Sequence, residues 1–107
     1  MKIEVLYVAE CPSHHAAVQL LKDELAAQGV AAEIRQILVA DAAMARQLRF
    51  CGSPTIRING RDVAGEPPGT ESYALSCRLY AGAKPAGLPP AEMVRRAVAE
   101  ARQGDLR

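Results

Sequence analysis

Tryptophan is absent from this chain of 107 residues, and phenylalanine occurs only once. Aromatic residues make up 4% of the chain while hydrophobic residues make up 50%, so the core must be built from aliphatic side chains. A half-apolar chain of this length can bury a core without disulfide or metal staples. We therefore expect residues 1–107 to form one domain and not two.

An excess of charge of one sign is also missing, since the formal net charge is +1 and both signs are mixed along the chain. This removes the electrostatic argument for a nucleic-acid partner. Long hydrophobic runs are missing too, because residues 1–8 are too short for a signal-peptide core and contain Glu4. No stretch reaches the length of a membrane span. We expect a soluble, cytoplasmic protein with no membrane partner.

Cysteine is scarce and odd in number, with Cys11, Cys51 and Cys77. Such a set argues against the disulfide framework of a small secreted protein. In a reducing compartment, a free thiol is a buried apolar residue, a metal ligand or a reactive group.

The first half of the chain alternates between strand and helix patterns. Residues 3–8 form an apolar run typical of a strand buried on both faces. Pro12 suits the first position of a helix, which the apolar spacing extends over residues 13–28 until Gly29 ends it. A second strand is predicted over residues 32–39.

The second half continues the alternation and adds a hairpin. Asp41 can cap a helix over residues 42–50, and residues 55–58 form a third strand. The pair Asn59-Gly60 is a strong hairpin signal, which predicts a fourth strand over residues 61–64.

Residues 65–90 are rich in proline and glycine and predict an irregular loop inserted before the last helix, which spans residues 91–103. The tail after residue 103 is expected to fray. The order β-α-β-α-β-β-α predicts an α/β fold with one mixed four-stranded sheet. Its first two strands should be parallel, and helices should cover both of its faces.

Two short motifs at fixed places in this order carry a resemblance. Cys11-Pro12-Ser13-His14 follows the first strand, and Ser53-Pro54-Thr55 precedes the hairpin. Together they resemble the thioredoxin/glutaredoxin fold family, over residues 1–64 and the last helix. In that family a Cys-x-x-Cys or Cys-x-x-Ser motif opens the first helix and faces a cis-proline before the third strand.

The resemblance implies that Cys11 is the nucleophile, and that Pro12, Ser53, Pro54 and Thr55 contact the substrate. It implies a cis bond before Pro54, with the preceding backbone pairing with extended peptides. A thiolate at the helix N-cap, where we place Cys11, would be stabilised by free N–H groups. The chain is also similar to small bacterial thioredoxin-like proteins, some of which are called alkylmercury lyases, but it has no second motif for that chemistry.

His14 stands where the family has its resolving cysteine, three residues after Cys11 and on the same face of the expected helix. It can serve as the proton partner of Cys11, as a metal ligand beside it, or simply as a solvated residue of the first turn. The dipole of the helix disfavours a positive charge at this place. For His15 we expect a solvated residue.

Cys77 and Cys51 are the other two thiols, and two roles are open for Cys77. The fourth strand should return towards Cys11, so that Cys77 lies on the same face and can form a disulfide with it; alternatively, Cys77 anchors the loop in the core. Cys51, beside Phe50, is expected to pack in the core. Four cations are expected on a solvated surface: Arg57, Arg61, Arg78 and Lys84.

The sequence therefore predicts a thiol oxidoreductase that uses Cys11, with His14 and Cys77 as further catalytic candidates. The mixed disulfide would be resolved by glutathione, Cys77 or a second protein. No cofactor is predicted beyond glutathione as a reductant, and the partner is a protein or a small thiol or disulfide. Two alternatives remain open: a binding module that has lost turnover, and a binder of zinc, copper or mercury.

Overall fold

The computed structural model of the chain describes residues 1–9, 11–50, 52–65 and 88–105. In the described residues, four strands and three helices follow one another as β1 (Ile3–Tyr7), α1 (His14–Ala27), β2 (Ile34–Leu38), α2 (Ala42–Leu48), β3 (Thr55–Ile58), β4 (Arg61–Asp62) and α3 (Ala91–Asp105). The fold is thus of the α/β class, as the alternation of sequence patterns predicts.

The strands form one mixed sheet in the order β2-β1-β3-β4. β1 and β2 are parallel, whereas β1 pairs antiparallel with β3, and β3 with β4. The hairpin turn is the predicted one: Asn59 and Gly60 have φ of 53° and 81°, which a two-residue turn of type I′ requires. The predicted mixed sheet and its parallel first pair are confirmed.

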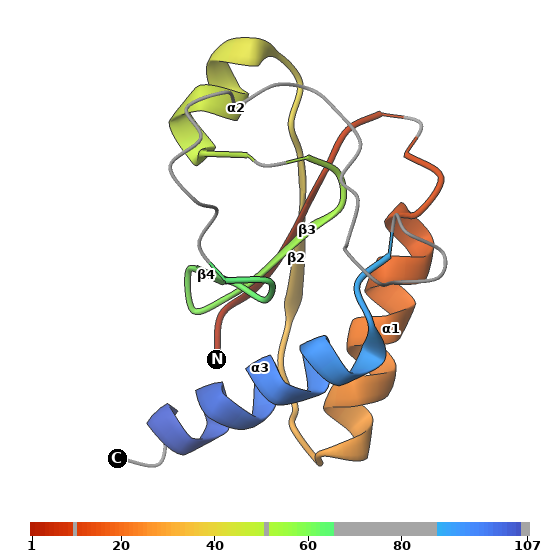
Figure 1. Cartoon of the computed structure of the whole chain (residues 1–107), viewed down its shortest axis with the longest axis vertical. Coiled ribbons are helices and arrows are strands. Elements are labelled where there is room, and N and C mark those ends of the chain that lie inside the picture. The colour runs from red at the N-terminus through yellow and green to blue at the C-terminus, as the bar shows by residue number, and fades with distance from the viewer. Residues whose placement is uncertain (10, 51, 66–87, 106–107) are drawn as a thin grey trace.

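Helices cover both faces of the sheet (Figure 1). Successive side chains of β1 point to opposite faces, so Val5 and Leu6 enter different clusters. Val5 packs with apolar residues of α1 and α3, and Leu6 packs with the Phe50 and Ala45 side chains beside α2. The chain thus places α1 and α3 on one face and α2 on the other.

The α2 face also carries a row of alternating charges across all four strands. Glu4 of β1 lies opposite Arg35 of β2 and Arg57 of β3, and Arg57 lies opposite Asp62 of β4. Opposite charges at facing positions stabilise neighbouring strands. The Nη2 atom of Arg57 also donates to the carbonyl of Arg49 at 2.9 Å, just after α2. Arg57, predicted to be solvated, is half-buried, and its hydrogen bond to the end of this helix lies at the solvent-exposed surface.

The C-terminal end of α1 follows the predicted glycine signal. Gly29 has φ of 66°, and its N–H donates to the carbonyl of Ala26 while the N–H of Val30 donates to that of Leu25. This is the Schellman arrangement, which satisfies the last carbonyls of a helix and favours glycine at the left-handed position.

The start of α1 differs from the prediction. The helix begins at His14 and its N-cap is Ser13, so Pro12 is not the first helical residue and Cys11 is not the N-cap. The first helical bond explains the shift, because the carbonyl of Ser13 accepts from the N–H of Ala17 at 2.9 Å. Cys11 therefore lies two residues before the cap.

Other boundaries differ by a few residues. α2 ends at Leu48 because Arg49 adopts a left-handed conformation. β4 ends at Asp62, whose Oδ1 accepts from the N–H of Ala64 and turns the chain. β2 starts at Ile34, opposite the first residue of β1. α3 continues to Asp105, so the tail predicted to fray is helical up to that residue.

Most of the predicted loop at residues 65–90 lies outside the described residues, as does the end of the chain after residue 105. Among the described helices, none combines the length and the apolar character that crossing a membrane would require.

Candidate functional site

Cys11 lies in the turn that joins the end of β1 to the start of α1. Its backbone N–H donates to the carbonyl of Val8 at 3.3 Å, and its own carbonyl accepts from the N–H of His14 at 3.4 Å. Its thiol is free and its side chain is half-buried. Hydrogen bonds within the turn thus hold both the N–H and the carbonyl of Cys11.

The stretch before β3 meets the same turn. The N–H of Val8 donates to the Oγ of Ser53 at 3.1 Å, while the carbonyl of Val8 accepts from Cys11. Cys11 and Ser53 are 42 positions apart in the sequence, and both form hydrogen bonds with the backbone of Val8. The bond between Ser53 and Pro54 is cis, which confirms the isomer expected from the resemblance.

The side chains of Ser53, Pro54 and Thr55 all face the interior. Ser53 is 2% exposed and Thr55 is fully buried. The Oγ1 of Thr55 donates to the carbonyl of Gly52 at 2.6 Å, so both hydroxyls have partners within the protein. Any substrate contact at this stretch therefore has to come from its backbone, whereas the exposed ring of Pro12 is accessible.

The N-terminus of α1 offers hydrogen-bond donors to this turn. The side chain of Ser13 does not cap the helix. Within the described part of the chain, no acceptor is found for the backbone N–H groups of His15 and Ala16. Unpaired N–H groups in the first turn of a helix stabilise a nearby anion, and a thiolate is such an anion.

The imidazole of His14 is held against the sheet beside this turn. It stacks on the ring of Tyr7 with the ring centres 3.7 Å apart and the planes at 7°. Its Nε2 lies 2.7 Å from the Oε1 of Gln36 on β2. His15, which the sequence predicts to be solvated, is exposed. Its ring stacks on the ring of His14, with the ring centres 4.8 Å apart.

The sequence analysis did not identify Tyr7 or Gln36 as part of this group. Tyr7 is the last residue of β1, and Gln36 is a polar residue in the middle of a predicted strand. Because β1 and β2 are parallel and α1 begins beyond their C-terminal ends, the two side chains come from the strands beside His14. An uncharged polar residue inside an edge strand was the signal that could have suggested Gln36.

Cys51 and Cys77 lie outside the described residues, as do Arg78 and Lys84. The roles predicted for these residues therefore stay predictions. Within the described ranges, no group of three His, Cys, Asp or Glu side chains is arranged to hold a metal ion. A metal site built on Cys11 and His14 would thus need a further ligand from elsewhere.

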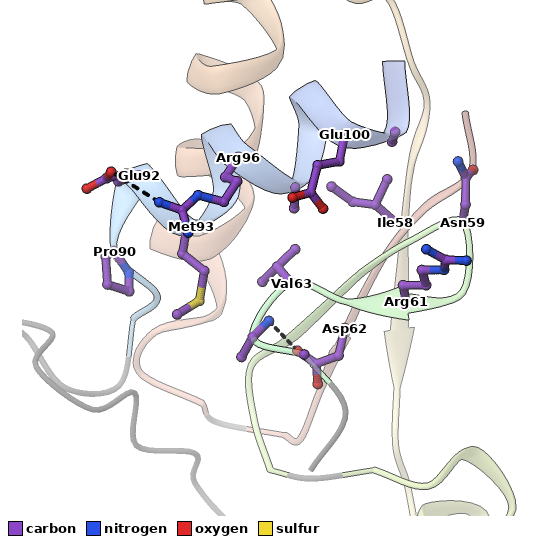
Figure 2. A pocket seen from close by; sticks show the side chains of 14 residues that line it. Ile58, Asn59, Arg61, Asp62, Val63, Pro90, Glu92, Met93, Arg96 and Glu100 are labelled. Atoms are coloured by element: carbon purple, nitrogen blue, oxygen red, sulfur yellow. Dashed lines mark hydrogen bonds and ion pairs between the residues drawn. The ribbon is translucent and has the colours of Figure 1, made fainter. Parts of the chain in front are cut away.

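A cavity of about 1100 Å³ lies elsewhere, between the β3–β4 hairpin and α3. Figure 2 shows Val63, just after β4, near Met93 of α3, and Ile58 of β3 near Glu100 of the same helix. Arg61, predicted to be solvated, is exposed and lines this cavity. None of the predicted site residues that the structure describes belongs to its lining, so it is separate from the Cys11 turn.

No protein-family model, no curated protein and no solved structure matches the chain.

Proposed function

We propose that this protein is a thioredoxin-like thiol oxidoreductase in which Cys11 is the nucleophile. The observation that carries the proposal is that Cys11 and Ser53 both form hydrogen bonds with the backbone of Val8. A half-buried free thiol then lies in the turn between a strand and a helix, and the residue that holds the backbone of this turn also holds Ser53 before β3. The resemblance to the thioredoxin/glutaredoxin family, which implies a cysteine turn facing the proline before the third strand, supports the proposal.

The start of α1 supports a reactive thiolate. The N–H groups of His15 and Ala16 lie within one turn of Cys11 and have no acceptor in the described residues. Because the thiolate is the attacking form of cysteine, donors and a helix dipole that stabilise it increase the reactive fraction. His14 adds a side chain that can take up or return a proton.

The proposed reaction is thiol–disulfide exchange. The Cys11 thiolate attacks one sulfur of a substrate disulfide, forms a mixed disulfide with it and releases the other half as a thiol after protonation. A second thiol then attacks the mixed disulfide, leaves with the substrate half as a new disulfide and restores Cys11. Glutathione or a second protein can supply that thiol, since His14 stands where the family has its resolving cysteine. If Cys77 attacks instead, it bonds to the sulfur of Cys11 and releases the substrate half as a second thiol, and two equivalents of glutathione then reduce the Cys11–Cys77 disulfide while being oxidised to glutathione disulfide. The reducing cytoplasm is the setting that this cycle needs.

The test is a pH series of iodoacetamide alkylation, with each of the three cysteines quantified by mass spectrometry. We expect Cys11 to react at least about ten times faster near neutral pH than cysteine in an unstructured peptide, because the thiolate is the reacting form. The variants Cys51→Ser and Cys77→Ser should retain the fast reaction, and Cys11→Ser should lose it. A Cys11 that reacts no faster than the peptide contradicts the proposal.

A second assay addresses the exchange itself. The reduced protein is mixed with a chromogenic aromatic disulfide, and thiol release is followed by absorbance. We expect a fast phase of one equivalent that is absent in Cys11→Ser. A fast phase that persists in that variant would assign the reactive thiol to another cysteine.

A further inference from the structure

The two edges of the sheet differ in how their outer backbone groups are used. β4, at one edge, is only two residues long, Arg61–Asp62. The N–H of Val63 donates to the carbonyl of Ile56, and backbone groups of successive residues point to opposite sides, so those of Asp62 point outward. The carbonyl of Asp62 accepts from the N–H of Gly65 at 3.0 Å, so the turn after β4 occupies this edge.

β2, at the other edge, leaves its outer backbone groups open over a strand of five residues. The N–H of Val39, just after β2, donates to the carbonyl of Tyr7 on β1 at 2.8 Å. By the same alternation, the groups that point away from β1 belong to Ile34, Gln36 and Leu38. In the described part of the chain, none of these outward N–H and carbonyl groups has a hydrogen-bond partner. Such an edge is a template for pairing with another strand.

The side chains of β2 indicate which strand fits this edge. Ile34, Gln36 and Leu38 point to the face of the sheet that α1 covers, where Ile34 packs against the core. Among the described residues, Leu38 is the one large hydrophobic side chain that is exposed, at 44%. We propose that β2 pairs antiparallel with β2 of a second copy of this chain, across a two-fold axis at Gln36, and so joins the two sheets into one.

Pairing about Gln36 satisfies both the backbone and the side chains. Gln36 lies opposite its own copy, and Ile34 lies opposite the partner's Leu38 on each side of the axis. All three outward-pointing residues then form hydrogen-bonded pairs, and each exposed Leu38 covers an Ile34. On the other face Arg35 lies opposite the partner's Ile37, so like charges do not face each other. The strand is thus complementary to itself in this register.

The neighbouring registers are less favourable. An axis at Arg35 places the two Arg35 side chains directly opposite each other, and facing like charges destabilise a strand pair. It also leaves Leu38 beyond the paired residues, whereas an axis at Ile37 leaves Ile34 beyond them, so each shift loses one of the three hydrogen-bonded pairs. An axis between two residues would set outward groups of one copy against inward groups of the other. Charge and hydrogen-bond direction therefore both select the axis at Gln36.

The first test is the association state of the full chain, measured by sedimentation velocity with a reducing agent present to exclude disulfide-linked dimers. Because the paired segment is short, we expect a weak dimer with a dissociation constant of about 10–100 μM. A chain that stays monomeric up to about 1 mM overturns the proposal, whether the edge is then bare or is covered by another protein.

Two variants act on this edge without removing a hydrogen bond between β1 and β2. Gln36→Pro deletes an outward N–H, which the edge of a sheet tolerates, and Leu38→Lys adds a charge of the kind that blocks pairing at natural edges. We expect each variant to raise the dissociation constant at least about tenfold while the far-UV circular dichroism stays unchanged. If Gln36→Pro alters that spectrum, Leu38→Lys alone decides.

The matched control for the added charge is Ala43→Lys, at an exposed position of α2. It should leave association unchanged, because α2 lies on the sheet face opposite α1 and away from the paired backbone. A dimer that survives the edge variants, or that weakens as much in the control, overturns the proposal.

The register is tested by isotope-filtered NMR on a dimer of labelled and unlabelled chains. Ile34 and Leu38 of one chain lie about 13 Å apart along the strand, so their methyl groups give no cross-peak within one copy. We expect an intermolecular cross-peak between the Ile34 and Leu38 methyl groups, and we expect Gln36→Pro to remove it. A dimer without this cross-peak overturns the register and with it the proposed interface.

Discussion

The hydroxyl of Ser53 accepts a hydrogen bond from the backbone N–H of Val8 at 3.1 Å. Ser53 is 2% exposed, and its place before β3 puts it against the residue that follows β1. The carbonyl of the same Val8 accepts from the N–H of Cys11. One buried hydroxyl therefore anchors the strand end from which the Cys11 turn begins.

Removing this hydroxyl should destabilise the domain. We expect Ser53→Ala to lower the free energy of unfolding by about 1–2 kcal/mol, since the Val8 N–H loses its partner. Urea denaturation followed by circular dichroism measures the change. The matched control is Ser13→Ala, because Ser13 is the N-cap of α1 but its side chain makes no capping bond. Equal unfolding midpoints for the two variants would show that the Ser53 hydroxyl is not an anchor.

The N-terminus of α2 depends on one carboxylate. The Oδ1 of Asp41 accepts from the N–H of Met44 at 2.8 Å, in the position of an N-cap. We expect Asp41→Ala to cost about 1 kcal/mol of stability, whereas Asp41→Asn should cost little because asparagine caps equally well. Thermal or urea unfolding of the three proteins separates the outcomes. If Asn and Ala cost the same, the charge and not the cap is what matters.

The pair of Glu24 and Arg95 joins α1 to α3. The Nε of Arg95 donates to the Oε2 of Glu24 at 3.2 Å, with the Glu24 side chain 10% exposed and the Arg95 side chain 60% exposed. Because the acid is the buried partner, we expect Arg95→Met to destabilise the domain more than Glu24→Gln does. The first variant leaves a buried charge without a partner, and the second leaves an exposed cation in water. Urea unfolding of both variants gives the comparison.

The same pair predicts little pH dependence in the neutral range. The hydrogen bond to Glu24, followed by its charge, raises the pKa of Arg95 above its ordinary value. A raised pKa gives stability that is fully present below the ordinary value and is lost only as the pH rises through the raised one. A double-mutant cycle at neutral and at mildly alkaline pH should therefore return the same coupling. A coupling that falls over this range would contradict the assignment.

The sequence prediction of a link between Cys11 and Cys77 can be tested by oxidation. We expect glutathione disulfide to produce a Cys11–Cys77 bridge, found as a linked peptide pair by mass spectrometry and reversed by reduction. Bridging needs the two Cα atoms within about 7 Å. The Cys77→Ser variant, which should stop at glutathionylated Cys11, is the control. If the wild type also stops there with Cys77 free, resolution comes from a second thiol outside the chain.

Local patterns were enough for most of the fold because each depends on neighbours in the sequence. The apolar run of β1, the apolar spacing of α1 and the Asn59-Gly60 turn all act over a few residues, and the structure contains each of these elements. Boundaries were less predictable where competing bonds decide them. Ser13, and not Cys11, became the cap of α1 because its carbonyl makes the first helical bond.

The sequence by itself determined the alternation of strands and helices and the place of Cys11 after the first strand. It did not determine which side chains surround that cysteine. Gln36 and His14 are 22 positions apart, and Val8 and Ser53 are 45 apart, so no local pattern relates them. Only the pairing of β1 with β2 on one side and with β3 on the other brings Gln36 to His14 and Ser53 to Val8, because hydrogen bonds between strands fix the register that side-chain periodicity leaves open.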